Sequence, residues 1–271
     1  MSGYSIIVLM SKPIKLAIWH GVVAAVSFGF WFDVSRWLQA AAIEKDFVSY
    51  AVITFGFIVA LVALGFMIFE KKWLVLSLPG MVALAYVANL GWSQLELIGL
   101  LILFLLAFKS YSDILRETRQ RIKITLSEIL RHGIFPFILG MFILLSFAAF
   151  QSPAFDRFEN LKGLPPETQN YIKVIAENTV GHKIEGSEQE KKIIINQISA
   201  EVTREFNTAL GPYFKYAPPV LAFTLFLILW SISWIFIWLS VLAGMLIFFI
   251  LKKTGFVRIE EKEIKAEILN V

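Results

Sequence analysis

The three histidines are the side chains of this sequence best suited to metal binding or acid–base catalysis, and they lie far apart. His20 is in an apolar run, His132 follows a basic segment, and His182 is in a polar stretch. Metal ligands and catalytic pairs recur at short, defined spacings. The sequence holds no HExxH, phosphate loop or GxSxG, and a triad of a serine with His182 and Asp156 lacks a nucleophile context. We therefore predict no enzyme, no metal site and no cofactor.

Ionisable side chains inside apolar runs would be the usual sign of transport, and this sequence has few of them. His20 lies one turn into the first run, and Glu96 lies at the edge of the fourth. We expect His20, beside Trp19, to lie at the membrane interface or to form a hydrogen bond. Glu96 is expected to extend to the membrane surface.

The composition indicates a membrane protein. Of the 271 residues, 58% are hydrophobic and 17% are charged, and the mean hydropathy is +0.71. An average soluble domain has about 25% charged residues. The absence of cysteine excludes disulfides and thiol catalysis. The apolar runs are Leu16 to Phe32, Phe47 to Phe69, Trp73 to Trp92, Leu95 to Phe108, Ile134 to Phe150 and Val220 to Leu251.

We predict an all-α, polytopic helical membrane protein with about six transmembrane helices and a small helical extracytoplasmic insert between the fifth and the sixth. The expected parts are a cytoplasmic leader (1–15), a four-span bundle (16–108), a basic amphipathic cytoplasmic helix (109–132), a fifth span (133–150), the insert (151–219), a long last helix that is partly transmembrane (220–251) and a cytoplasmic tail (252–271). Pro79 predicts a kink in the third span. A cleaved signal peptide ending near Ala40 is the alternative for the first run, which is longer than the usual 7–15 apolar residues.

The last run is too long for one simple span. At about 1.5 Å per residue it would extend roughly 48 Å, against a hydrocarbon core of about 30 Å. A hairpin of two short helices is one interpretation. The other is one long helix, whose first part projects from the membrane and whose Trp230, Trp234 and Trp238 mark the interface.

The basic residues predict the orientation. Fifteen of them, including Arg131, fall in the leader, in two loops and in the tail, whereas the short loops of the opposite face hold only Arg36 and Lys45. Basic loops stay in the cytoplasm. We therefore predict a plasma (inner) membrane protein with both termini cytoplasmic. The net charge of +4 comes from basic residues that flank the apolar runs and do not form one polar domain. We therefore expect no nucleic-acid partner.

Residues 109–132 show a helical apolar stripe bordered by bases. Such a helix could lie in the headgroup layer, where its cations contact anionic lipid. The predicted lipid-contact residues are Arg116, Arg119, Arg121 and Lys123. An ordinary cytoplasmic loop is the simpler alternative.

The polar insert predicts two helices. The first begins at Pro165-Pro166 and ends near Val180, and the second begins at a capping box of Ser187 and Glu190 and ends at Gly211-Pro212. Two helices alone form a marginal core, so the apolar face of the second should contact another surface. The predicted partner-contact residues are Ile195, Ile198, Val202 and Phe206.

Small residues four apart occur in the first span (Gly21, Ala25, Gly29) and in the second (Gly56, Ala60). They let helices approach closely, and we expect packing within the chain, with homo-oligomerisation as the alternative. The favoured function is a structural, assembly or scaffold component that presents the outer helices to an envelope or membrane protein. A channel or transporter for a small or weakly polar solute is the alternative.

Overall fold

The computed structural model describes residues 11–39, 45–121, 124–152, 166–180, 188–210 and 216–257, and within these residues the regular structure is helical, without strands. The helices are α1 (Lys12–Gln39), α2 (Lys45–Phe69), α3 (Leu74–Leu90), α4 (Gln94–Gln120), α5 (Leu126–Gly133), α6 (Phe135–Phe150), α8 (Pro166–Val180), α9 (Glu188–Leu210), α10 (Ala217–Ser231) and α11 (Ser233–Lys253). The predicted all-α class is confirmed. The chain forms two compact units, 1–37 with 42–144 and 229–271, and 38–41 with 145–228.

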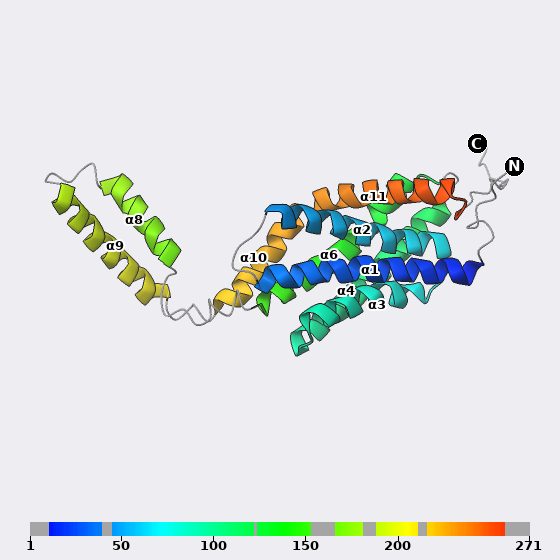
Figure 1. The fold of residues 1–271 in the computed structure, drawn as a ribbon, viewed down its shortest axis with the longest axis horizontal. Coiled ribbons are helices and arrows are strands. Elements are labelled where there is room, and N and C mark those ends of the chain that lie inside the picture. The colour runs from blue at the N-terminus through cyan, green and yellow to red at the C-terminus, as the bar shows by residue number, and fades with distance from the viewer. Residues whose placement is uncertain are drawn as a thin grey trace, which may run out of the picture. The chain divides into compact units, whose positions relative to one another are not determined.

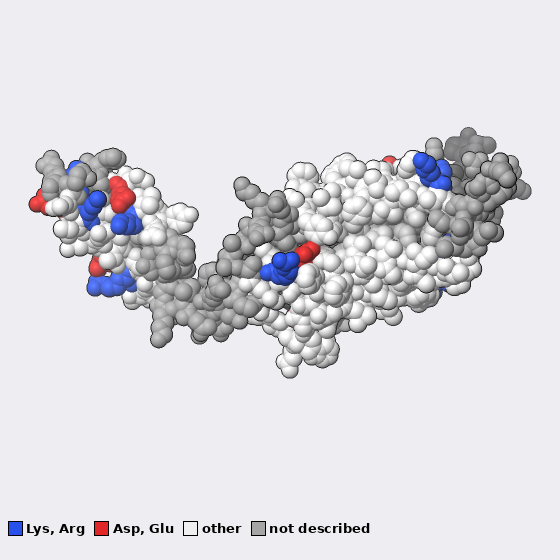
Figure 2. All heavy atoms as spheres, in the orientation of Figure 1, with Lys and Arg blue, Asp and Glu red and all other residues white. Residues whose placement is uncertain are grey.

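Several helices are long and apolar enough to cross a membrane. They are Lys12–Gln39, Ser49–Phe69, Gln94–Gln120 and Ser233–Lys253. α5 and α6, which meet at a 43° bend, would together form a fifth span, while α3 and most of α10 are apolar but shorter. The space-filling view in Figure 2 shows a largely uncharged surface along the first unit. These helices are those of a membrane protein, and the number of six spans stays a prediction.

Helix α2 lies at the centre of the first unit, packed against α3, α4, α5 and α11. Figure 1 shows α1, α2 and α11 running along the same direction. The Phe55 ring of α2 contacts three other rings, those of Phe30 in α1, Phe142 in α6 and Phe236 in α11, at centroid distances of 5.9, 5.5 and 5.0 Å. This aromatic cluster joins four helices in the interior of the unit.

The start of α1 and the ends of α2 and α11 meet at one end of the first unit. The Trp19 ring lies 6.0 Å from Phe69 and 6.2 Å from Phe256, and the Trp19 indole donates to the Leu61 carbonyl. The bases that belong to this end are Lys12, Lys15, Lys71, Lys72, Lys252 and Lys253. Bases that are separated in the sequence are therefore gathered at one end of the bundle.

Residues 109–132 do not form the single amphipathic helix that we predicted. α4 carries the fourth apolar run without interruption to its end at Gln120, and the chain returns as a second helix, α5. The Ser110 hydroxyl donates a hydrogen bond of 2.6 Å to the Gly133 carbonyl, which fastens α5 to α4. Ile129 and Leu130 of α5 are completely buried, and one continuous helix would have carried them away from the bundle.

The last apolar run adopts neither expected form, because it divides at Ile232 into α10 and α11. A single residue is shorter than the roughly 2–5 residues of a helical hairpin loop, and it also interrupts a single long helix. The indoles of Trp230, Trp234 and Trp238 are exposed, at 50, 61 and 57%. α11 alone has the length of a span.

The small residues of the two spans differ in what surrounds them. A Cβ added at Gly56 would lie 3.0 Å from Leu239 of α11, so this glycine packs within the chain as expected. At Gly21 and Gly29 an added Cβ would meet nothing within 4 Å, so the expected packing is wrong for the first span. α3 continues as one helix across Pro79, and the kink expected there stays a prediction.

In the second unit, α8 and α9 pack against each other. Both helices have the bounds that the proline, glycine and capping signals predicted. Ser187 of the expected capping box lies outside the described residues. The two expected helices are therefore confirmed, and their place in an extracytoplasmic insert stays a prediction.

Candidate functional site

The α8–α9 pair has a small interior and a large exposed apolar surface. Ile195 and Ser199 of α9, one turn apart, are buried to 6 and 9% exposure. On α8, Tyr171, Val174 and Ile175 remain exposed at 70, 50 and 62%. Their spacing of three and four places them on one side of α8, and we call them the α8 stripe. The pair therefore buries little of its own apolar surface and leaves one helix side uncovered.

The structure separates the four predicted partner-contact residues of α9. Ile195 is buried within the second unit, and Ile198 and Val202 are half-buried, so these three are wholly or partly covered by the unit itself. Phe206 is exposed at 48% and stays available to a partner. The α8 stripe was not among the predicted contact residues, although its spacing of three and four is visible in the sequence.

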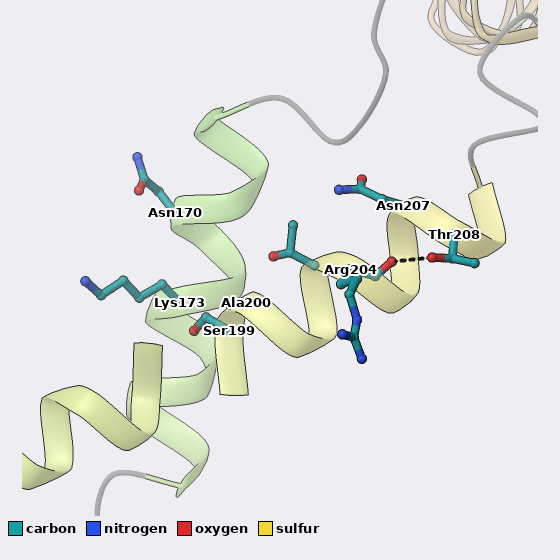
Figure 3. Close-up of a pocket in the computed structure, with 8 residues that line it drawn as sticks. Asn170, Lys173, Ser199, Ala200, Arg204, Asn207 and Thr208 are labelled. Atoms are coloured by element: carbon teal, nitrogen blue, oxygen red, sulfur yellow. Dashed lines mark hydrogen bonds between the residues drawn. The ribbon is translucent and has the colours of Figure 1, made fainter. Parts of the chain in front are cut away.

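An open cleft of about 670 Å³ lies between α8 and α9. Figure 3 shows Asn170 and Lys173 on α8, and Ser199 on α9 where the two helices cross. The Ser199 hydroxyl is buried and has no hydrogen-bond partner among the described residues. Arg204, also at the cleft, is ion-paired with Glu201 on its own helix. The cleft can offer hydrogen bonds to a polar group, and its lining includes no histidine or carboxylate for acid–base chemistry.

Two of the predicted lipid-contact bases, Arg116 and Arg119, lie on the last turns of α4, and Arg121 is the C-cap of that helix. Arg116 is exposed and lies 3.3 Å from Asp113, and Arg119 is exposed. Arg121 bonds Glu117 at 3.0 Å and also Glu128 of α5. Lys123 lies outside the described residues.

Arg121 thus joins α4 to α5, and its carboxylate partners raise the pKa of its guanidinium, Glu117 most of all. Its charge is therefore already engaged within the protein. Of the three predicted lipid-contact bases that the structure describes, Arg116 and Arg119 are exposed as we expected, although Arg116 also pairs with Asp113.

Polar side chains link α1 to α3 in the first unit. The His20 ring bonds the Ser77 hydroxyl at 2.9 Å through Nε2 and the Leu16 carbonyl at 2.9 Å through Nδ1. The ring stacks on Trp73 at a centroid distance of 5.5 Å. One of our two expectations for His20, a hydrogen-bonded histidine, is confirmed.

Glu96 does not extend to the surface as we expected, because it is 3% exposed. Its carboxylate accepts a hydrogen bond of 3.1 Å from the Tyr86 hydroxyl and one of 2.7 Å from the Ser93 backbone nitrogen. Ser93 in turn caps α4, so the three residues close the turn between α3 and α4. Glu96 therefore fixes a turn.

No set of three or more histidine and carboxylate side chains in the described residues is placed to hold a metal ion. Comparison with protein-family models, with curated proteins and with solved structures finds no match to this chain.

Proposed function

We propose that this chain is an integral membrane protein that acts as an assembly or scaffold component and binds a protein partner through the α8–α9 pair. The single observation that carries the proposal is the α8 stripe, where Tyr171, Val174 and Ile175 are exposed side by side. Large apolar side chains that are contiguous and exposed mark interaction surfaces more often than scattered ones do. Tyrosine is also among the residues enriched at protein interfaces.

The chemistry of the surface fits a protein. Three side chains on one helix side match the way in which an amphipathic helix inserts into a groove, with anchors at positions i, i+3 and i+4. Phe206 of α9 adds a second exposed ring on the same unit. The proposed partner is an envelope or membrane protein on the side opposite the bases of the bundle, with both termini of this chain in the cytoplasm.

Photo-crosslinking tests this function. A photoreactive amino acid at Ile175 in the full chain, activated in native membranes, should give a discrete crosslinked protein, while the same group at the exposed Thr208 serves as the matched control. Tyr171→Ser should abolish the crosslink. Crosslinks to lipid alone, or equal products at both positions, would contradict the proposal.

The topology has a separate test, because the chain contains no cysteine. Arg204→Cys should react with an impermeant maleimide added to intact cells, whereas Arg119→Cys should react only after the membrane is opened. The opposite pattern would place α8 and α9 in the cytoplasm.

Transport is a second candidate, favoured by one observation. α5 and α6 form a pair of apolar helices broken at a 43° bend, and broken helices line the substrate sites of many transporters. On the other side, His20 and Glu96 already bond within the bundle. Solute flux through vesicles containing the purified chain would favour transport over assembly.

A further inference from the structure

Arg131 of α5 lies against the side of α11, between the two ends of that helix. Its guanidinium lies over the Trp238 ring of α11, with Cζ 5.6 Å from the ring centroid. Trp238 follows the start of α11 at Ser233 by about 7–8 Å at the helical rise, and it precedes Lys252 by roughly 21 Å. Since α11 has the length of a span, the Arg131 guanidinium lies within the depth that hydrocarbon would occupy.

Two further contacts support this depth. Phe236, two residues before Trp238, packs on Phe55 and Phe142 in the interior cluster of the unit, so this level is not an end of the bundle. Leu130, the neighbour of Arg131, would lie 2.5 Å from a Cβ added at Gly244. The Arg131 side chain therefore extends from that level towards Trp238, away from the end that carries the lysines.

Arg131 is also exposed, and in the described part of the chain no carboxylate pairs with it. A charged side chain in hydrocarbon is unfavourable unless an opposite charge or water compensates it, and an indole face compensates it only in part. Among the carboxylates of α4 and α5, Asp113 already pairs with two bases, Glu117 and Glu128 pair with Arg121, and Glu96 bonds Tyr86. We therefore expect an anion from another molecule to bind beside Arg131.

The neighbouring face of α11 has the form of a helix contact. Exposed side chains follow one another along it at spacings of three and four. They are Trp234, Trp238, Leu242, Met245 and Phe249. Lipid phosphates lie outside the hydrocarbon, whereas a helix can carry a carboxylate at any depth.

We propose that Arg131 and Trp238 form an intramembrane binding site for a carboxylate carried by a transmembrane helix of a partner protein, which packs along the exposed row of α11. The site is independent of the α8–α9 pair, so either proposal can fail without the other. The guanidinium donates hydrogen bonds to the carboxylate, and the row of apolar side chains supplies the packing surface.

The test uses the full chain in phosphatidylcholine vesicles with a synthetic transmembrane peptide of leucine and alanine. The peptide carries one glutamate at a chosen depth, and its matched form carries glutamine there. Energy transfer from a dye at Lys253→Cys to a dye on the peptide measures the association. We expect the glutamate peptide to bind about 5–30-fold more tightly at one depth, the range of intramembrane polar contacts.

The variants locate the effect. Arg131→Gln should remove the preference for glutamate, Arg131→Lys should keep part of it, and Arg119→Gln, which removes an exposed base elsewhere, should leave it unchanged. Because the glutamate and glutamine peptides are compared on the same wild-type chain, the result does not depend on a variant folding.

Equal binding of the two peptides would overturn the proposal, as would an unchanged preference in Arg131→Gln. Loss of the preference when the vesicles contain phosphatidylglycerol would overturn it in favour of an anionic lipid. If the wild-type chain self-associates and Arg131→Gln abolishes this self-association, the proposal would be overturned in favour of a second copy of the chain as the partner.

Discussion

The close approach of α4 and α5 at Gly133 gives the most direct prediction from the fold. A Cβ added at Gly133 would overlap the Ile114 side chain of α4 and lie 3.3 Å from the Ile114 Cα. Ile114 is 0% exposed, so its side chain has no free space to move into. Gly133→Ala should therefore force the two helices apart.

The magnitude follows from three effects. Overpacking a close contact costs about 1–3 kcal/mol, and the contact with backbone places this site in the upper part of that range. Separation of the helices also weakens the bond from Ser110 to the Gly133 carbonyl, worth about 1 kcal/mol. The better helix propensity of alanine offsets about 0.5–1 kcal/mol of this. We expect Gly133→Ala to lower the free energy of unfolding by about 2–3 kcal/mol.

The assay is reversible unfolding of the purified chain in mixed micelles, followed by circular dichroism. Gly80→Ala is the matched control, because a Cβ there would meet nothing within 4 Å, and it should be neutral or slightly stabilising. Ile114→Ala removes the atoms that clash, so the double variant should be more stable than the sum of the single effects. A Gly133→Ala protein as stable as wild type would refute the packing of α5 on α4.

Two further predictions concern buried groups. Glu96→Leu should lower the free energy of unfolding by about 1–3 kcal/mol, because the Tyr86 hydroxyl loses its acceptor. Glu96→Gln should keep much of that bond. Equal losses of stability in the two variants, measured in the same micelle assay, would contradict the role of Glu96 as the acceptor. Ile195→Ala should destabilise the α8–α9 pair by about 2–4 kcal/mol, whereas Phe206→Ala should change it by under about 0.5 kcal/mol. Limited proteolysis between α8 and α9 measures the stability of the Ile195→Ala and Phe206→Ala proteins. Faster cleavage of Phe206→Ala than of Ile195→Ala would contradict the assignment of Ile195 to the interior and of Phe206 to the surface.

Local signals predicted the helices of the second unit well. Proline at the start of α8 and glycine after it define its bounds, and α9 ends where Gly211-Pro212 follows. These signals act over a few residues, so they can be identified without knowledge of the fold. Ser93 and Glu96 carry the same kind of signal, a capping box, and it could have predicted that Glu96 turns inward.

The predictions were wrong where residues far apart in the sequence determine the structure. The pattern of 109–132 suits a helix, yet contacts of α5 with α2 and α11 fold the chain back, and nothing in the segment itself indicates them. The small residues of α1 and α2 look alike in sequence, and only the position of Leu239 beside Gly56 distinguishes them. Helix periodicity tells which residues share a face, and the neighbours of that face depend on the whole fold.

The position of Arg131 likewise depends on the whole fold and could not be predicted from the pattern of charges alone. The count of bases placed Arg131 with fourteen others on the cytoplasmic side. The predicted orientation does not change when Arg131 is left out of the count, because the short loops of the opposite face hold only Arg36 and Lys45. Bases such as Arg121 lie beyond the apolar part of α4 and pair with neighbouring carboxylates. Arg131 instead reaches Trp238, deep along α11. A base that only orients a helix needs contact with water, so the depth of Arg131 requires a different explanation, and an acidic partner helix supplies one.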